Sequence, residues 1–87
     1  MQKKANKLDR PLQDMPGFVL HALKEHGVMD DYYARPPYQQ NDYLWWINSA
    51  KRQETKIKRL GQMLRELEHG GIYMNMPHPA SKKPENS

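Results

Sequence analysis

The side chains that could bind a metal or move protons are scattered along this 87-residue chain. The histidines are His21, His26, His69 and His78. His21 and His26 are five residues apart, which on a helix places them about 140° from each other and not on one face. The chain has no cysteine, so it can form neither a thiolate metal site nor a cysteine nucleophile. We therefore expect no metal, no cofactor and no catalytic group, and a protein that is not an enzyme.

Carboxylates occur close together at Asp30-Asp31 and at Glu66 and Glu68. Acids that are adjacent or two residues apart on a solvated segment usually lie at the surface or cap a helix. We interpret both pairs as surface or capping groups. In particular, Glu66 and Glu68 are expected to lie with Glu54 on a solvated helix face.

One set of basic residues with a nearby tryptophan could form a binding surface. Arg52, Lys56 and Arg59 fall within about 60° of one another at helical spacing. With Trp45 they could contact a phosphate backbone and stack a base. Alternatively, they form a solvated face whose aliphatic stems cover the edge of the core. The candidate interaction surface is therefore Trp45, Arg52, Lys56 and Arg59, with a protein as the expected partner and nucleic acid as the alternative.

The two tryptophans are neighbours in sequence but should point about 100° apart on a helix. Trp46 shares an arc with other core candidates, and we expect it to anchor the core. These candidates are Tyr43, Ile47 and Ala50. Trp45 lies on the outer arc, where two readings remain open. It is covered by the loop from Tyr32 to Tyr38, or it is exposed and marks a partner surface.

The charge distribution does not favour a phosphate-binding domain. The net charge is +4. Residues 1–14 carry four bases and two acids, residues 75–87 carry two bases and one acid, and the stretch between them carries eight bases and seven acids. The central stretch is therefore nearly neutral. No stretch approaches the ~20 apolar residues of a membrane span, and residues 1–14 lack the apolar run of a secretory signal. We expect a cytoplasmic protein without membrane insertion.

Three helices are predicted to position these residues, at about 16–26, 39–50 and 53–69. Pro16 suits a first turn, and Gly27 suits the left-handed residue that follows a helix. Leu23 and Val28 then occupy the two positions that touch in a Schellman cap. The third helix has an apolar seam spaced three, four and three residues apart. It consists of Ile57, Leu60, Leu64 and Leu67.

The remaining segments are predicted to be irregular. Pro36-Pro37 forces the preceding residues out of helical geometry, so we expect an ordered loop at 30–40. Residues 72–76 are expected to form an extended tail packed over a helix groove. The fold class is thus an all-α bundle of three helices with disordered ends. The predicted organisation is a flexible basic tail at 1–14, a helical domain at 15–76 and a flexible tail at 77–87.

One run of residues around the second and third predicted helices has an unusual composition. It reads Trp46-Ile47-x-x-Ala50-Lys51-x-x-Glu54-Thr55-Lys56-x-x-Arg59-Leu60, with Ala22-Leu23 upstream and a leucine seam that ends at a glycine. The run resembles the YdeI/OmpD-associated family of bacterial proteins over about Met15 to Gly70. Family members usually show Thr-Arg at Thr55-Lys56 and often a small or polar residue at Trp45. They often carry this segment after another module, and any function that resides in that module is not implied for this chain. The resemblance implies a bacteriocin-protection, stress or envelope-related role that acts through protein contacts.

Overall fold

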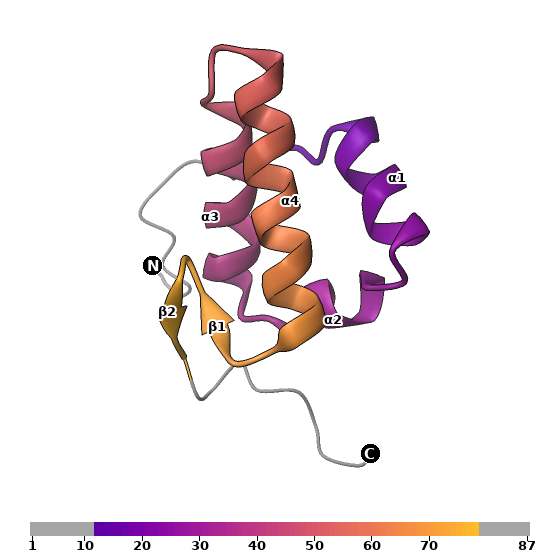
Figure 1. Cartoon of the computed structure of the whole chain (residues 1–87), viewed down its shortest axis with the longest axis vertical. Helices are drawn as coiled ribbons and strands as arrows, with labels where there is room; N and C mark the ends of the chain where they lie inside the picture. Colours follow the sequence, from indigo (N-terminus) through magenta and orange to yellow (C-terminus); the bar gives the residue numbers. More distant parts are fainter. Residues whose placement is uncertain (1–11, 79–87) are drawn as a thin grey trace, which may run out of the picture.

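The computed structural model describes residues 12–78, which form four helices and one short hairpin (Figure 1). The elements are α1 (Gly17–Glu25), α2 (Met29–Ala34), α3 (Pro37–Asn48), α4 (Gln53–His69), β1 (Ile72–Tyr73) and β2 (Met76–Pro77). The expected all-α class is confirmed, with four helices in this part of the chain where three were predicted. Within the same residues, no helix combines the length and apolar character that crossing a membrane requires.

Helix α1 ends as its sequence predicts. Gly27 has φ +68°, a conformation that costs glycine no steric strain. The amide of Val28 donates to the carbonyl of Leu23 at 3.0 Å, and the amide of Gly27 donates to the carbonyl of Lys24 at 3.1 Å. These are the two hydrogen bonds of a Schellman cap. The cap turns the chain towards α2 and buries Val28.

The predicted loop at 30–40 is wrong, because α2 occupies its first half and α3 begins at Pro37. Asp30 and Asp31 lie in the first turn of α2, where the helix dipole favours negative charge. The predicted break at the prolines is confirmed, but it is short. Arg35 and Pro36 are extended, with ψ 152° and 147°, and Pro37 already takes the first position of α3, which tolerates proline.

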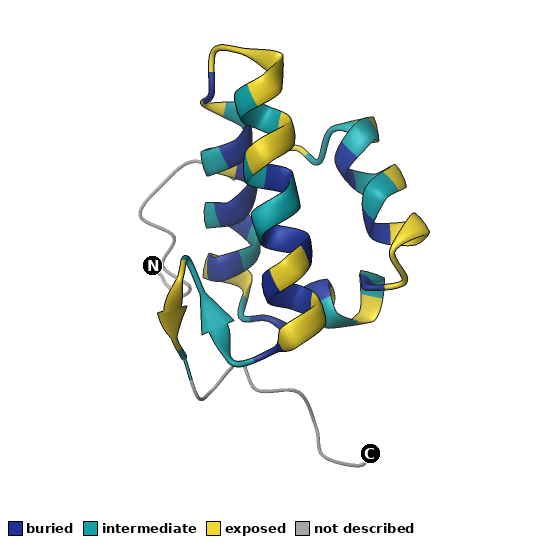
Figure 2. Ribbon diagram, in the orientation of Figure 1, coloured by how far each residue is buried: buried dark blue, intermediate teal, exposed yellow. Residues whose placement is uncertain are grey.

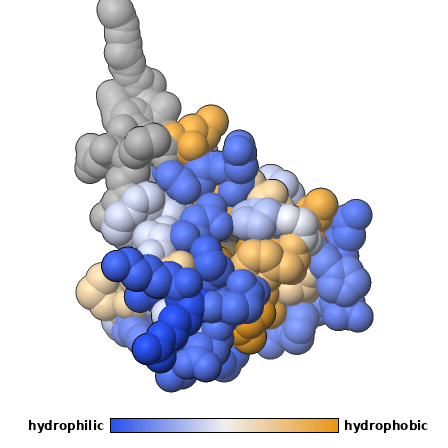
Figure 3. Space-filling model, turned by 90° about the horizontal axis from the view of Figure 1, so that it is seen from above, coloured by the Kyte–Doolittle hydropathy of each residue, from blue (hydrophilic) through white to orange (hydrophobic). Residues whose placement is uncertain are grey.

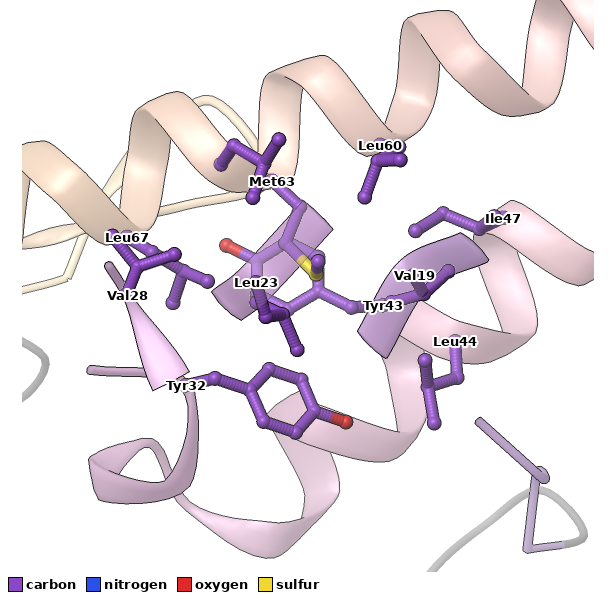
Figure 4. Close-up of a cluster of buried hydrophobic side chains, with 11 residues drawn as sticks. Val19, Leu23, Val28, Tyr32, Tyr43, Leu44, Ile47, Leu60, Met63 and Leu67 are labelled. Carbon is purple, nitrogen blue, oxygen red and sulfur yellow. The ribbon is translucent and has the colours of Figure 1, made fainter. Parts of the chain in front are cut away.

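The core lies where α3 and α4 pack together and α1 and α2 close over them (Figure 4). Its buried side chains are Val19, Leu23, Val28, Tyr32, Tyr43, Leu44, Ile47, Leu60, Met63, Leu64 and Leu67. The predicted seam of the last helix is correct except at its start. Ile57 is 50% exposed, whereas Met63 is fully buried. The first turn of α4 extends beyond α1, so exposed residues dominate there (Figure 2).

Residues 72–77 form an antiparallel hairpin, and the predicted extended tail is wrong. Tyr73 pairs with Met76, and Ile72 pairs with Pro77. Met74 and Asn75 connect the strands with φ 52° and 66°. Two central residues with positive φ define a type I′ turn, whose twist matches that of the flanking strands. A two-residue turn of this kind needs a stabilising contact when a methionine occupies it, because a side chain in this region is strained.

The predicted flexible segments, 1–14 and 77–87, lie mostly outside the described residues. At the start of the described part, the amide of Gln13 donates to Oδ1 of Asn41 at 2.7 Å. The Asn48 side chain donates to the carbonyl of Asp14 at 3.3 Å. Residues 13 and 14 therefore contact α3. The mobility of the two ends stays a prediction.

Candidate functional site

Two of the predicted surface residues bind the end of α3. Lys56 donates from Nζ to the carbonyl of Asn48 at 3.0 Å, and Arg59 donates from Nη1 to the carbonyl of Trp46 at 2.7 Å. The last carbonyls of a helix have no partner within the helix. Cations placed there act as donors to them and interact favourably with the negative end of the helix dipole. Lys56 and Arg59 thus join α4 to α3.

The side chains of the other two predicted surface residues make different contacts. Arg52 is the N-cap residue of α4 and pairs with Glu54 at 3.6 Å, with both side chains more than three quarters exposed. Such an exposed pair contributes little to stability. Trp45 is 37% exposed and lines a hollow that contains none of the three basic residues. The role of these residues in binding a partner stays a prediction.

Trp46 packs against the core, as predicted, but it is only partly buried. The guanidinium carbon of Arg59 lies 5.3 Å from the centre of its ring. A cation over a tryptophan face is stabilised by the ring quadrupole. Trp46 therefore contacts the core and Arg59 together.

Glu66 is a buried residue that sequence reasoning placed at the surface. It was expected on a solvated face, yet it is only 4% exposed. Its Oε1 accepts from the Tyr43 hydroxyl and from the amide of Met74 at 2.9 Å. Its Oε2 accepts from the Gln62 amide group at 3.0 Å and from the amide of Asn75 at 2.8 Å. Four donors on one buried carboxylate satisfy the charge and fix the hairpin turn on α4.

A second buried charge contacts the backbone of Glu66. Arg35 is 4% exposed and donates from Nη2 to the backbone carbonyl of Glu66 at 3.1 Å and from Nη1 to Gln39 Oε1 at 3.2 Å. The carbonyl belongs to the last turn of α4, where a cation opposes the helix dipole. The sequence carried one usable signal that Glu66 is buried. Glu66 follows Met63 by three residues and precedes Leu67 directly, so it lies on the buried arc.

The phenols of the core are held in their neutral form. Burial, and then the hydrogen bond to Glu66, raise the pKa of Tyr43 far above its usual value. Burial, and then the neighbouring Tyr33, raise the pKa of Tyr32. A phenol with a raised pKa is a poor proton donor to a reaction at neutral pH. Tyr43 acts as a hydrogen-bond donor to Glu66.

The histidines of the described part do not converge. His21 pairs with Glu25 at 3.5 Å, and His26 pairs with Glu68 at 3.5 Å, both at the surface. His78 lies beside Tyr38 and Gln39 at the hairpin. Between residues 12 and 78, no group of three His, Asp or Glu side chains is placed to hold a metal ion.

An apolar groove of about 370 Å³ runs between α1 and α4, and we call it the α1–α4 groove. It is lined by Ala22, His26, Ile57, Leu60, Gly61, Leu64, Arg65 and Glu68. The apolar members form its floor, and the three polar residues lie at its border. Seen from above, an apolar patch is bordered by hydrophilic residues (Figure 3).

Comparison with known proteins identifies the family. Neither the curated proteins nor the solved structures contain a match to the chain. A family model described as "Bacteriocin-protection, YdeI or OmpD-Associated" matches residues 14–70. The match covers more than half of the chain and includes all four helices. The chain therefore belongs to the bacteriocin-protection, YdeI or OmpD-associated family.

Proposed function

We propose that this chain is a non-enzymatic protein-interaction module, an accessory domain in a bacteriocin-protection or envelope-related stress role. The family assignment supports the biological setting. The α1–α4 groove supports the mode of action, and the half-exposed Ile57 in its apolar lining is the observation that carries the proposal. Ile57 leaves half of its surface in water at the open end of this groove. An apolar floor with a polar border is the usual anatomy of a protein interface.

The groove fits an amphipathic helix of the partner. From Ile57 to Glu68 it follows α4 for about 16 Å, or three turns. A docked helix would place apolar side chains on the floor at spacings of three and four residues. His26, Arg65 and Glu68 offer both signs of charge at the border, so the polar face of the partner helix would be mixed in charge.

Gly61 makes the floor deeper. A Cβ atom at this position would meet only Nη1 of Arg65, at 3.6 Å, so no neighbouring helix requires the glycine. A glycine in a helix interior costs about 1 kcal/mol relative to alanine. The proposed interaction explains why a glycine is present despite this cost, because a larger side chain at position 61 would fill the groove.

The alternative, nucleic-acid binding by Trp45, Arg52, Lys56 and Arg59, finds less support. Lys56 and Arg59 already bind backbone carbonyls of α3, so moving them to phosphates would break those hydrogen bonds. The salt dependence separates the two functions. Phosphate binding falls steeply as salt rises, whereas an apolar groove contact does not. Oligonucleotide titration at two salt concentrations is the measurement for this alternative.

The proposed function can be tested by site-specific photo-crosslinking in lysate of the native host. A photoreactive side chain replaces Ile57, and the matched control replaces Tyr33, which is 57% exposed on α2. We expect a discrete protein adduct from position 57, none from position 33, and loss of the adduct in a chain that also carries Gly61→Leu. Equal adducts at the two positions, or an adduct that Gly61→Leu leaves unchanged, would refute a partner in the groove.

A further inference from the structure

A second concave site lies on the opposite side of the α3–α4 pair, between α3 and the hairpin. It has a volume of about 260 Å³. Its lining residues are Asp42, Trp45 and Trp46 of α3, and Tyr73 and Met74 of the hairpin. We call it the aromatic hollow. Three aromatic rings, a thioether and a single carboxylate therefore surround one small space.

The helix geometry of α3 brings the carboxylate and the two indoles together. Asp42 precedes Trp45 by three residues and Trp46 by four, and residues at these spacings share a helix face. Trp45 lies at the surface, 37% exposed, so a ligand can reach it from solvent. The Trp46 ring already contacts a cation, the guanidinium of Arg59 at 5.3 Å, so a ligand cation in the hollow would contact the rings of Trp45 and Tyr73.

The hairpin side of the hollow is rigidly positioned. The Tyr73 hydroxyl donates to Oδ2 of Asp42 at 2.7 Å. The Tyr73 ring packs edge-to-face against Tyr43, with centroids 5.4 Å apart, and against Tyr38 at 6.1 Å. Both amides of the hairpin turn are held by the Glu66 carboxylate. A wall fixed in this way loses little entropy when a ligand binds.

We propose that the aromatic hollow binds a trimethylammonium group. Aromatic rings attract a cation through their faces, and the Asp42 carboxylate, which also accepts a hydrogen bond from Tyr73, places a negative charge in the same lining. Aromatic rings and the Met74 thioether make favourable van der Waals contacts with methyl groups. A bare ammonium is strongly hydrated, and these side chains cannot replace the hydrogen bonds that it would lose to water. The hollow therefore prefers a methylated cation to an unmethylated one. The trimethylammonium group can come from a small molecule such as choline or from a trimethyllysine side chain.

The test is an NMR titration of the full chain that follows the indole N–H signals of Trp45 and Trp46. The probe is tetramethylammonium chloride at constant ionic strength, and the comparison compounds are ammonium chloride and a neutral tert-butyl alcohol. We expect saturable shifts with the probe and binding at least about tenfold weaker for both comparison compounds. Choline and a trimethyllysine peptide, titrated in the same way, identify the source by which of them binds more tightly.

Variants keep the assignment falsifiable without unfolding the domain. Trp45→Phe retains a ring and should weaken binding several-fold, whereas Trp45→Ala and Asp42→Asn should weaken it about tenfold or more. Ile57→Ala in the α1–α4 groove is the matched control and should leave tetramethylammonium binding unchanged. Unsaturable shifts, or equal binding of the cation and its neutral counterpart, would overturn the proposal. The proposed protein interaction would be unaffected by that result, because the groove lies elsewhere on the molecule.

Discussion

Helix α4 has two sides that are built in opposite ways. Towards the hairpin, Glu66 is buried and its carboxylate accepts four hydrogen bonds. Towards α1, the residues facing the groove are mainly apolar and Ile57 is left half exposed. The first side fixes a segment of the chain in one place, because a buried charge is tolerated only when it is fully bonded. The second side leaves apolar surface that a partner can cover.

The largest expected effect is on the hairpin side. Glu66→Ala leaves the Tyr43 hydroxyl and the amides of Met74 and Asn75 without their acceptor, and should lower the free energy of unfolding by about 3 to 5 kcal/mol. Such a loss approaches the whole stability of a small domain. The matched control is Glu68→Ala, whose half-exposed side chain pairs with His26, and it should cost under about 1 kcal/mol. Denaturant melts measure both, and equal losses would contradict the account.

Alkaline pH should have the next largest effect, through the two buried tyrosines of the core, of which Tyr43 bonds to Glu66 on the hairpin side. Folding raises the pKa of Tyr43 and Tyr32 above the unfolded value of about 10. Their contribution to stability is therefore complete below pH 10 and is lost as the pH rises towards the folded pKa values. Above pH 10 the free energy of unfolding should fall by about 1.4 kcal/mol per pH unit for each tyrosine. Denaturant midpoints as a function of pH check this, and a Tyr43→Phe chain should show a shallower decline. A flat profile up to pH 11 would be inconsistent with two buried phenols.

A smaller effect is expected where the first turns of α4 bind the end of α3. Arg59→Ala removes a hydrogen bond to the carbonyl of Trp46 and a cation over its ring, and should cost about 1 to 2 kcal/mol. Arg52→Ala removes only an exposed ion pair and should cost under about 0.5 kcal/mol. Thermal melts of the two variants provide the comparison. A larger loss of stability for Arg52→Ala than for Arg59→Ala would show that Arg59 does not hold the end of α3.

The smallest expected change lies on the groove side and has the opposite sign. Gly61→Ala should raise the free energy of unfolding by about 0.5 to 1 kcal/mol, since the added methyl makes only an ordinary contact with Arg65. The same methyl fills part of the floor of the α1–α4 groove, so capture of the partner should weaken. Denaturant melts and the Ile57 crosslinking assay measure these two effects on one variant. A gain in stability with unchanged crosslinking would show that Gly61 does not contribute to partner binding in the groove.

Local signals in the sequence predicted the ends of helices well. The Gly27 cap, the break before Pro37 and the end of the last helix at Gly70 all follow from backbone sterics of glycine and proline. The helix α2 was missed because prolines were taken to make the whole segment irregular, although their restriction reaches back by only one residue each.

Long-range pairing explains what the sequence could not predict. The hairpin needs positive φ at Met74 and Asn75, and asparagine favours this conformation more than methionine does. The stabilising acceptor is Glu66, eight residues earlier in the chain and on another element. Periodicity counts a glutamate as polar and therefore as exposed, so the same rule that found the apolar seam misplaced this carboxylate. The α1–α4 groove was missed for a similar reason, since spacing alone shows neither which apolar residues are covered nor how far apart two helices lie.

Amide hydrogen exchange at the hairpin turn tests the difference between the two sides of α4 most directly. Turn amides at the surface usually exchange quickly, whereas an amide bonded to a buried acceptor is released only when the structure opens. We expect the amides of Met74 and Asn75 to exchange as slowly as those in the middle of α4, and Glu66→Gln to accelerate both by at least about tenfold. Rapid exchange of these two amides in the wild-type chain would show that Glu66 does not hold the hairpin.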